Sequence, residues 1–561
     1  MRKGKQARRA TLELYDLGGR DGIPGVKMAG FKAHNLMRMA SLGLPVPQGF
    51  VLTTEWCRAV QQPQAVDARM RSALVSRIGG LERATGLTFG GARRPLFVSV
   101  RSGAPVSMPG MMETVLDVGL NDSTLDGFLR LSGDHRLVWD SYRRLIQSFA
   151  EVVAGVPAEP FEEALEAVLR RDGVDAAPRL DFRALRELSR TYLDLHRAHT
   201  GREFPQNPLE QLEAATRAVF ASWSSPKAVE YRRLYALPDD MGTAVTVQRM
   251  VFGNAGGNSG AGVGFTRDPS TGEQRLYVDW LAHAQGEDIV SGRRRVASEQ
   301  ELPLWLRQRL EAVGESLEKA FLDAQEFEFT IENGELFMLQ TRTAKRSAIA
   351  ALRIAVEQVD SGLIDSREAL RRLAGIDVGA ITMRRVEATA PPIARAIPAG
   401  IGVAAGPAVF SAEAARACAG RGTPAILVSD DLSTDDIAAI ALVGGVLTAR
   451  GGRTSHAAVV ARQMGKVCLV GCTGLRVDAR ARKATLGACV IADGDSLCLD
   501  GNGGAVYADS PRILEERPDD LIARMEGWRR DRVNPDSVVV AATSTRARAG
   551  LVLHHCGVLG E

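Results

Sequence analysis

The feature that most constrains this chain is a glycine pair, Gly451-Gly452, followed by His456 and a run of small apolar residues. The glycines can adopt positive φ and approach an anion closely, and the Ala/Val run to Met464 favours a helix that Gly465 can end. The positive end of such a helix keeps the imidazole of His456 neutral and then stabilises a phosphoryl group on it. The run predicts a phosphate-carrying histidine, and the alternative is a helix cap with a structural histidine.

The composition indicates a soluble protein of several domains and argues against a nucleic-acid or membrane partner. The 561 residues are 45% hydrophobic, which is enough for several cores and predicts several domains. The net charge of +3 comes from interleaved acidic and basic residues, so we expect no nucleic-acid partner. No apolar run approaches the roughly 20 residues of a membrane-spanning helix, and the N-terminus leads into no signal-like segment. We therefore expect a soluble, cytoplasmic protein without a membrane partner.

The alternation of strand-like and helix-like segments predicts a multidomain α/β and α+β protein. Short apolar strands with Gly/Pro turns alternate with segments of helical periodicity, and Ala390-Pro391-Pro392 marks a boundary. The expected parts are 1–122 (α+β), 123–235 (helical), 236–346 (α+β), 347–390 (helical connector), 391–509 (Gly-rich α/β unit with the histidine) and 510–561 (a tail without a complete domain).

Residues 326–342 read as a β-hairpin, in which the loop length decides which side chains share a face. A two-residue turn at Asn333-Gly334 mixes polar with apolar side chains. A three-residue loop, Glu332-Asn333-Gly334, places five apolar side chains together, and we therefore predict it. The five are Phe327, Phe329, Ile331, Phe337 and Leu339.

The other face of this hairpin carries the polar side chains. They are Glu326, Glu328, Gln340 and Arg342. Two carboxylates and an amide oxygen suit Mg²⁺, and the guanidinium suits a phosphate, so the face predicts a magnesium-polyphosphate site. The alternative is a solvent-exposed face of salt bridges.

Three further segments suit phosphate chemistry but are weak signals alone. Arg101 ends an apolar strand and precedes a Ser/Gly/Met loop, and residues 258–265 form a Gly-rich loop whose backbone amides could cover phosphates. Lys32 is another candidate cation, for which a surface lysine is the alternative. Neither loop has the spacing of a P-loop or of a dinucleotide-binding turn.

Five motifs occur in an order that resembles pyruvate, phosphate dikinase, one of the enzymes that use phosphoenolpyruvate and a swivelling phosphohistidine domain. The similarity runs from about Lys27 to about Tyr507. The motifs are Ser107-Met108-Pro109-Gly110-Met111-Met112-Glu113-Thr114, Phe204-Pro205-Gln206-Asn207-Pro208, Met250-Val251-Phe252-Gly253-Asn254, Ala284-Gln285-Gly286-Glu287-Asp288 and Gly452-Arg453-Thr454-Ser455-His456.

The resemblance implies an ATP-grasp nucleotide-binding domain with a helical insertion at 123–235, linked to a swivelling phosphohistidine α/β domain at 391–509. It implies ATP and Mg²⁺ as cofactors. The implied site residues are His456 and Arg342 (catalytic), Lys32, Arg101 and Gln340 (nucleotide-binding), and Glu326, Glu328 and Gln340 (metal-binding).

The family's chemistry is likewise an expectation. The histidine receives the β,γ-diphosphoryl group of ATP and releases AMP, inorganic phosphate removes the outer phosphoryl group as pyrophosphate, and the phosphohistidine moves to a pyruvate-binding barrel. Positioning and charge neutralisation carry most of such a transfer. Thr454 matches the position at which a regulatory kinase can switch the family off, because a phosphate there repels the incoming one.

Departures from the family qualify this reading. Glu326 stands where the family usually has Asp, and Arg453 replaces the usual Met. Residues 510–561 are too few to close an eight-stranded barrel, so we expect the chain to lack a pyruvate site and to pass its phosphoryl group to a separate barrel protein. The alternatives are another small-molecule acceptor or a non-catalytic nucleotide-binding relic.

Overall fold

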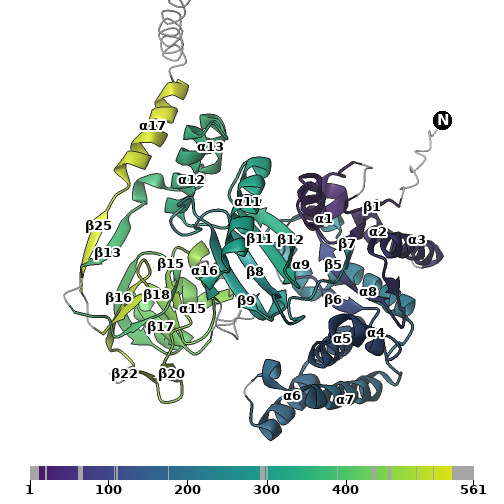
Figure 1. Cartoon of the computed structure of the whole chain (residues 1–561). Coiled ribbons are helices and arrows are strands. Elements are labelled where there is room, and N and C mark those ends of the chain that lie inside the picture. Colours follow the sequence, from purple (N-terminus) through teal and green to yellow (C-terminus); the bar gives the residue numbers. More distant parts are fainter. Residues whose placement is uncertain are drawn as a thin grey trace, which may run out of the picture. The chain divides into compact units, whose positions relative to one another are not determined.

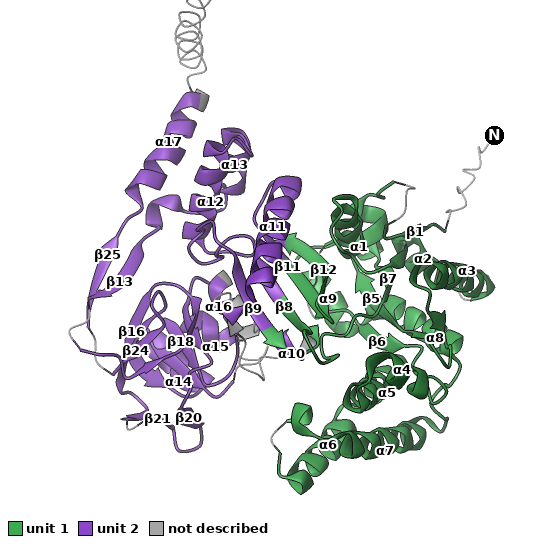
Figure 2. Ribbon diagram, viewed as in Figure 1, with its two compact units in different colours: residues 1–262, 281–286, 327–342 green, residues 263–280, 287–326, 343–561 purple. Residues whose placement is uncertain are grey.

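The described residues form two compact units (Figure 2). Unit 1 comprises residues 1–262, 281–286 and 327–342, and unit 2 comprises residues 263–280, 287–326 and 343–561. Both units draw on the predicted part 236–346, and the predicted domain boundaries remain predictions. No described helix is long and apolar enough to cross a bilayer. The computed structural model describes residues 12–18, 22–60, 67–106, 108, 111–174, 176–290, 297–298, 301–387, 390–431, 437–452, 456–487, 489–508 and 511–533.

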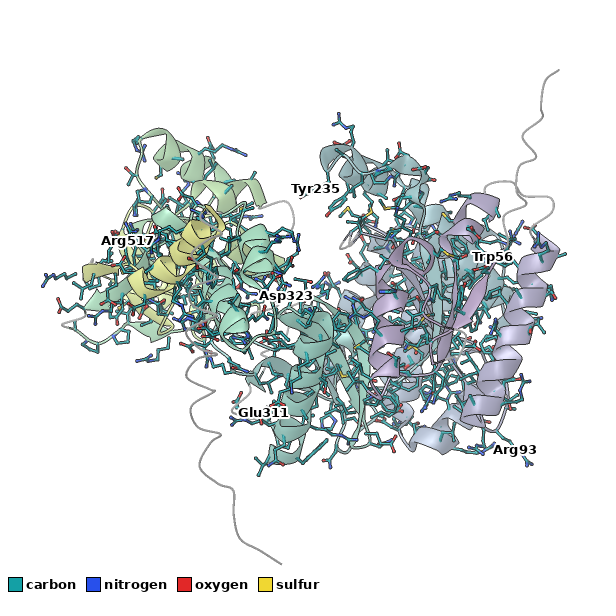
Figure 3. All side chains as sticks on the ribbon, turned by 90° about the horizontal axis from the view of Figure 1, so that it is seen from above. Trp56, Arg93, Tyr235, Glu311, Asp323 and Arg517 are labelled. Carbon is teal, nitrogen blue, oxygen red and sulfur yellow. The ribbon has the colours of Figure 1, made fainter. Side chains whose placement is uncertain are left out.

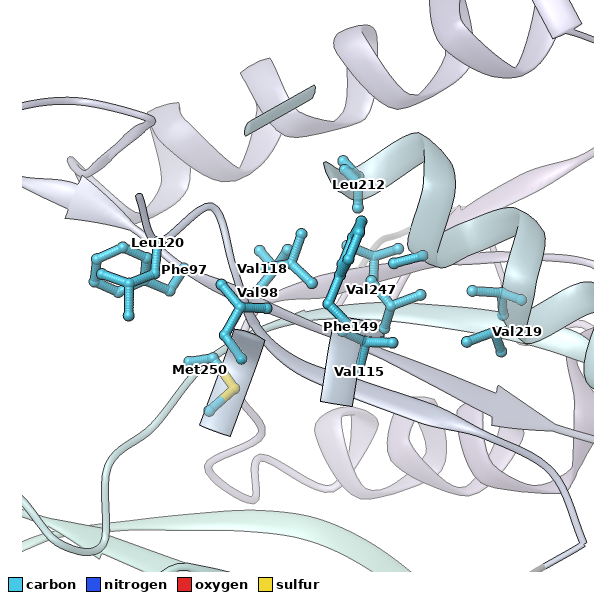
Figure 4. Close-up of a cluster of buried hydrophobic side chains, with 14 of the residues drawn as sticks. Phe97, Val98, Val115, Val118, Leu120, Phe149, Leu212, Val219, Val247 and Met250 are labelled. Carbon is cyan, nitrogen blue, oxygen red and sulfur yellow. The ribbon is translucent and has the colours of Figure 1, made fainter. Parts of the chain in front are cut away.

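A five-stranded sheet in the order β1-β2-β7-β5-β6 forms the centre of unit 1 (Figure 1). Buried side chains of the helices α5 and α8, among them Phe149 and Leu212, pack against valines of its strands (Figure 4). The elements are β1 (Leu14–Asp16), α1 (Val26–Ser41), β2 (Gly49–Leu52), α2 (Thr54–Val60), α3 (Asp67–Thr85), β5 (Val98–Gly103), β6 (Thr114–Val118) and β7 (Ala244–Arg249), with a small pair β3 (Thr88–Phe89) and β4 (Pro95–Leu96).

Six helices follow β6, and side-chain caps fix where several of them begin. The carboxylates of Asp134 and Asp181 accept hydrogen bonds from the first backbone amides of α5 and α7. Asn207 does the same for α8, with Pro208 as the first helical residue, so the Phe204–Pro208 motif starts a helix. The helices are α4 (Leu125–Ser132), α5 (His135–Ala154), α6 (Glu159–Asp172), α7 (Phe182–Thr200), α8 (Pro208–Ala221) and α9 (Pro226–Leu234).

A second five-stranded sheet, in the order β10-β9-β8-β11-β12, contributes strands to both units. Its last strand, β12, is an edge strand, so the backbone N–H and C=O groups on one side of it have no neighbouring strand of this sheet to bond to. The elements are β8 (Gly260–Phe265), β9 (Tyr277–Ala282), α10 (Gly286–Val290), β10 (Ala297–Ser298), α11 (Leu304–Phe321), β11 (Gln325–Glu332) and β12 (Glu335–Thr343).

Three helices of unit 2 share a small apolar core that includes Leu352, Ile522 and Met525. They are α12 (Ala348–Asp360), α13 (Ser366–Arg372) and α17 (Asp519–Val533). Asp323, labelled in Figure 3, pairs with Arg346 at 2.7 Å and with Arg372 at 3.3 Å, which ties α13 to the segment before β11. The predicted connector region therefore contains packed helices.

A two-stranded antiparallel ribbon adjoins these helices. It pairs β13 (Met383–Glu387) with β25 (Arg512–Glu516). Three cross-strand ion pairs line it: Arg384 with Glu515 at 2.6 Å, Arg385 with Glu516 at 2.7 Å, and Arg512 with Glu387 at 3.1 Å. The chain enters the following eight-stranded sheet through one strand of the ribbon and leaves through the other.

The eight-stranded sheet has the order β14-β24-β23-β16-β17-β18-β19-β15 and is nearly closed. Its two end strands, β14 and β15, are separated in the sequence by Ala396 alone, so one extended segment pairs with both β24 and β19. The strands are β14 (Ala394–Arg395), β15 (Ile397–Gly400), β16 (Val403–Val409), β17 (Ile426–Ser429), β18 (Gly445–Thr448), β19 (Val467–Val470), β23 (Ser496–Asp500) and β24 (Ala505–Tyr507).

This sheet bears on two expectations. The sequence predicts a Gly-rich α/β unit at these residues, and the structure adds that its sheet is nearly closed. The expected absence of a barrel is not confirmed, since a barrel-like sheet is present, although its mixture of parallel and antiparallel pairs differs from an all-parallel acceptor barrel. Its helices are α14 (Ala412–Gly420), α15 (Ile437–Leu442) and α16 (His456–Gln463), and β20 (Leu475–Asp478), β21 (Lys483–Leu486) and β22 (Cys489–Ala492) form a separate three-stranded sheet.

Truncation of Leu499, which is fully buried in β23, should loosen the nearly closed sheet. We expect Leu499→Ala to destabilise it by about 2–5 kcal/mol, because the substitution leaves a cavity in a packed core. Amide hydrogen exchange followed by mass spectrometry should show faster exchange across residues 394–507. Val490→Ala, in the side chain that is 63% exposed on β22, serves as the control and should leave exchange unchanged.

Candidate functional site

Lys32 is positioned by an interruption of α1. Gly30 has φ 71° and ψ 162° within the helix, and a β-carbon on it would lie 1.8 Å from the carbonyl oxygen of Gly103. The amide of Phe31 donates to the carbonyl of Ala104 at 2.9 Å, so the helix restarts against the end of β5. Lys32 therefore lies in the first turn of the restarted helix, close to Gly103.

Arg101 on β5 contacts the hairpin of β11 and β12. Its Nη2 is 3.5 Å from Oε2 of Glu328 on β11, with the two side chains 17% and 31% exposed. Its Nη1 donates to the carbonyl of Leu339 on β12 at 3.5 Å. The guanidinium thus contacts both strands of the hairpin without being removed from solvent.

The electrostatics of Lys32 show which charges surround it. Burial is the largest cause that lowers its pKa, to about 7, and the positive charges of Arg101 and Arg342 add to the effect while Glu328 opposes it. The charges that act on Lys32 are therefore two positive ones, from Arg101 and Arg342, and one negative one, from Glu328. An excess of positive charge at a partly buried place favours a polyanion.

The hairpin turn differs from the prediction. β11 ends at Glu332 and β12 begins at Glu335, so the loop has two residues and the predicted three-residue loop is wrong. Asn333 and Gly334 have φ 52° and 83°, as in the turn whose twist matches that of paired strands. Hydrogen bonds from their amides to Ser259 Oγ and to the carbonyl of Asn258 hold the turn in place.

The shorter loop changes which side chains of β12 are buried. Leu336 and Met338 are buried, whereas Phe337 and Leu339, predicted for the apolar face, are only partly buried. The alternation then shifts by one residue, because Leu339 and Gln340 are both partly exposed and Thr341 is buried. Gln340 and Arg342 are therefore partly exposed, as Leu339 is. Three members of the predicted polar set, Glu328, Gln340 and Arg342, are partly exposed, whereas Glu326 is buried, and the geometric argument for the set fails.

The predicted metal ligands, Glu326, Glu328 and Gln340, all offer oxygen atoms, which hard cations such as Mg²⁺ prefer. Glu328 is partly exposed beside Arg101, Gln340 is partly exposed, and Glu326, two residues before Glu328 on β11, is largely buried. The described residues contain no group of three His, Cys, Asp or Glu at metal-ligand spacing. The carboxylate of Glu328 and the amide oxygen of Gln340, both in unit 1, are of the ligand type that suits Mg²⁺ with its remaining oxygens from a bound polyphosphate or water.

The Gly-rich segment that follows β7 is held by side chains from the hairpin and from residues 281–286. Glu332 accepts a hydrogen bond from the amide of Phe252 at 2.9 Å, and burial raises the pKa of this carboxyl. Gln285 donates through Nε2 to Oδ1 of Asn254 at 2.9 Å, and both side chains are buried. Sequence reasoning assigned Glu332 to the loop and missed this anchoring role, which no local pattern signals.

His456 is the first residue of α16, as the sequence predicts, and the helix ends at Gln463, shortly before Gly465 with φ 65°. Arg462 is buried and donates from Nε to the carbonyl of Ala399 at 3.0 Å, which fixes the helix to β15. The side chain of His456 and the whole of Thr454 lie outside the described part of the structure. The residues Lys32, Arg101, Glu328, Gln340 and Arg342 belong to unit 1, whereas Glu326 and α16 belong to unit 2.

Comparison with known proteins adds two family matches. Residues 66–301, which include Arg101, match the family described as "Pyruvate phosphate dikinase, AMP/ATP-binding domain". Residues 422–504, which include His456, match "PEP-utilising enzyme, mobile domain".

Similar curated proteins carry the name pyruvate, phosphate dikinase. The chain is 42% identical over 511 residues to that of Clostridium symbiosum, covering 89% of this chain and 58% of the relative. It is 40% identical over 512 residues to that of Giardia intestinalis, covering 90% and 58%. With the chloroplastic pyruvate, phosphate dikinase 1 of Zea mays the identity is 41% over 488 residues, covering 86% and 51%. The chain thus spans a little over half the length of these relatives.

The lowered pKa of Lys32 predicts a pH dependence of polyphosphate binding. Below pH 7 the ammonium is charged and attracts the anion, and above it one of three positive charges is lost. We expect the affinity for ATP to fall by roughly fivefold between about pH 6 and about pH 8.5, measured by titration calorimetry at constant ionic strength.

Lys32→Arg is the matched control, because a guanidinium stays charged throughout this range. The protonation of ATP itself is common to both proteins, so the difference between their pH profiles isolates Lys32. Identical profiles for the two proteins would contradict the assignment.

Proposed function

We propose that this chain is an ATP-dependent phosphotransferase similar to pyruvate, phosphate dikinase, in which ATP and inorganic phosphate phosphorylate His456 with release of AMP and pyrophosphate. The observation that carries the proposal is that Arg101 pairs with Glu328 at 3.5 Å, while the charges of Arg101 and Arg342 both act on the partly buried Lys32. The two family matches and the named relatives support the same reading.

In this proposal the three cations bind the triphosphate of ATP and neutralise charge as the transfer proceeds. Lys32 in the first turn of the restarted helix and Arg101 on β5 contact phosphate oxygens, and Arg342 orients the group that is transferred. Glu326, Glu328 and Gln340 are the proposed magnesium ligands. The metal, when bound, neutralises phosphate charge and draws electrons from the leaving group.

The chemistry on His456 follows from its place at the start of α16. A neutral ring nitrogen attacks the β-phosphorus, the bond from that phosphorus to the oxygen shared with the α-phosphate breaks, and AMP leaves. Inorganic phosphate then attacks the γ-phosphorus, pyrophosphate leaves, and one phosphoryl group stays on the ring. The exposed amides at the start of a helix suit the charge of that phosphoryl group.

The acceptor that we propose is pyruvate, the substrate in the relatives' name. Those relatives carry the name on longer chains, and nothing in the comparisons supports a separate barrel protein as a partner. Regulation through phosphorylation of Thr454 stays a prediction from the sequence.

Replacement of the histidine tests the carrier role. We expect wild-type protein incubated with Mg²⁺ and ATP labelled in the β-phosphate to release AMP and to gain acid-labile label, and His456→Ala to gain none, because the only proposed nucleophile is lost. His456→Ala should still bind ATP within about twofold of wild type, since the binding residues are intact. His199→Ala, exposed on α7, is the control. Label that persists in His456→Ala would overturn the assignment.

Removal of the Glu328 charge tests the magnesium site. We expect Glu328→Gln to raise the Mg²⁺ concentration needed for half-maximal ATP binding by about tenfold, because a carboxylate ligand becomes a neutral amide. Glu335→Gln alters an exposed glutamate at the start of β12 in the same hairpin and should leave the requirement unchanged. Equal magnesium requirements in Glu328→Gln and wild type would exclude Glu328 as a ligand.

A further inference from the structure

Asn35 lies on α1 one turn after Lys32 and reaches the hairpin. Its side chain is 3% exposed, and its Nδ2 donates to the carbonyl of Thr341 at 2.8 Å. Thr341 lies between Gln340 and Arg342 on β12. One buried hydrogen bond therefore joins the helix that carries Lys32 to the strand segment that carries two other proposed site residues.

The hydrogen bond from Asn35 gives a backbone carbonyl of the edge strand β12 a partner outside the sheet. In this strand the carbonyls of Leu339 and Thr341 accept hydrogen bonds from the side chains of Arg101 and Asn35. In the same stretch the amide of Met338 donates to the carbonyl of Pro45. Groups outside the sheet therefore hold this part of β12. If the buried carbonyl of Thr341 lost its donor, it would remain out of water without a hydrogen bond, which costs free energy. The structure therefore favours the arrangement in which Asn35 supplies the bond.

The place of this bond is also where the burial pattern of β12 shifts by one residue. Thr341 is buried, and its neighbours Gln340 and Arg342 are partly exposed. The carbonyl of Thr341 accepts the hydrogen bond of Asn35. The amide of Asn35 therefore supplies a fixed point at this stretch of β12.

We propose that Asn35 is a positioning residue for nucleotide binding: through the carbonyl of Thr341 it sets Gln340 and Arg342 at a fixed separation from Lys32. The inference rests on the proposed function, because it assigns those three residues to the ATP site. Asn35 itself touches no phosphate in this scheme. Its effect on ATP therefore has to pass through Lys32 and β12.

Two variants and a control on the same helix test this role. Asn35→Ala removes the donor, and Asn35→Leu removes it while nearly preserving the volume, so that a folded variant is available if one of them is unstable. His34→Ala is the control, since Nδ1 of His34 bonds the carbonyl of Pro24, away from β12. Circular dichroism and thermal unfolding confirm the fold of each variant.

The first measurement is the affinity for ATP with Mg²⁺, by calorimetry, in wild-type and Lys32→Met backgrounds. We expect loss of Asn35 to weaken binding about tenfold in wild type but less than about twofold in Lys32→Met, because residues that act through one another are not additive. His34→Ala should change the affinity less than about twofold. A tenfold loss in both backgrounds would mean a general structural role, and no loss in wild type would overturn the proposal.

The second measurement needs no nucleotide. Amide hydrogen exchange of residues 335–343 should rise in both Asn35 variants and stay at the wild-type level in His34→Ala. Unchanged exchange there would show that Asn35 does not fix β12. If wild type binds no ATP, the proposed function fails, and the exchange result still decides whether Asn35 positions the strand.

Discussion

The contact between the backbones of Gly30 and Gly103 is the constraint on which the site in unit 1 depends. A β-carbon at Gly30 would overlap the carbonyl oxygen of Gly103, and the φ of 71° is one that other residues rarely adopt. Because of this contact the helix restarts beside β5, Lys32 comes within the field of Arg101, and Asn35 reaches β12. The absence of a side chain at Gly30 thus allows Lys32 to lie near Arg101.

The polar residues of the candidate site were selected from the sequence, and their roles stay predictions, whereas their geometry could not be predicted. The alternation of charged and apolar residues in 326–342 selected the hairpin, and Arg101 was selected as the end of a strand that in the structure continues to Gly103. The loop length was wrong because the apolar pattern counts only which side chains prefer burial. The Asn-Gly turn, the hydroxyl of Ser259 and a shift in the alternation of β12 decide the actual arrangement.

Other features had no local signal. Asn35 and Glu332 act on backbone groups 306 and 80 residues away, and a polar residue within an apolar segment does not reveal its partner. The near closure of the eight-stranded sheet depends on a three-residue stretch around Ala396 that pairs on two sides. Such pairings are set by tertiary structure, so the start of α16 at His456 was predictable while the sheet around it was not.

The ribbon of β13 and β25 has a mechanical consequence. A body held by a single strand can reorient about any rotatable bond in that strand, whereas here the incoming and outgoing strands are paired to each other and cross-linked by ion pairs. Asn502 adds a hydrogen bond from its Nδ2 to the carbonyl of Arg384, at 2.6 Å. Reorientation of residues 394–507 therefore requires either that the two paired strands twist together or that their hydrogen bonds and ion pairs break first. Salt screens the ion pairs and so favours separation of the strands.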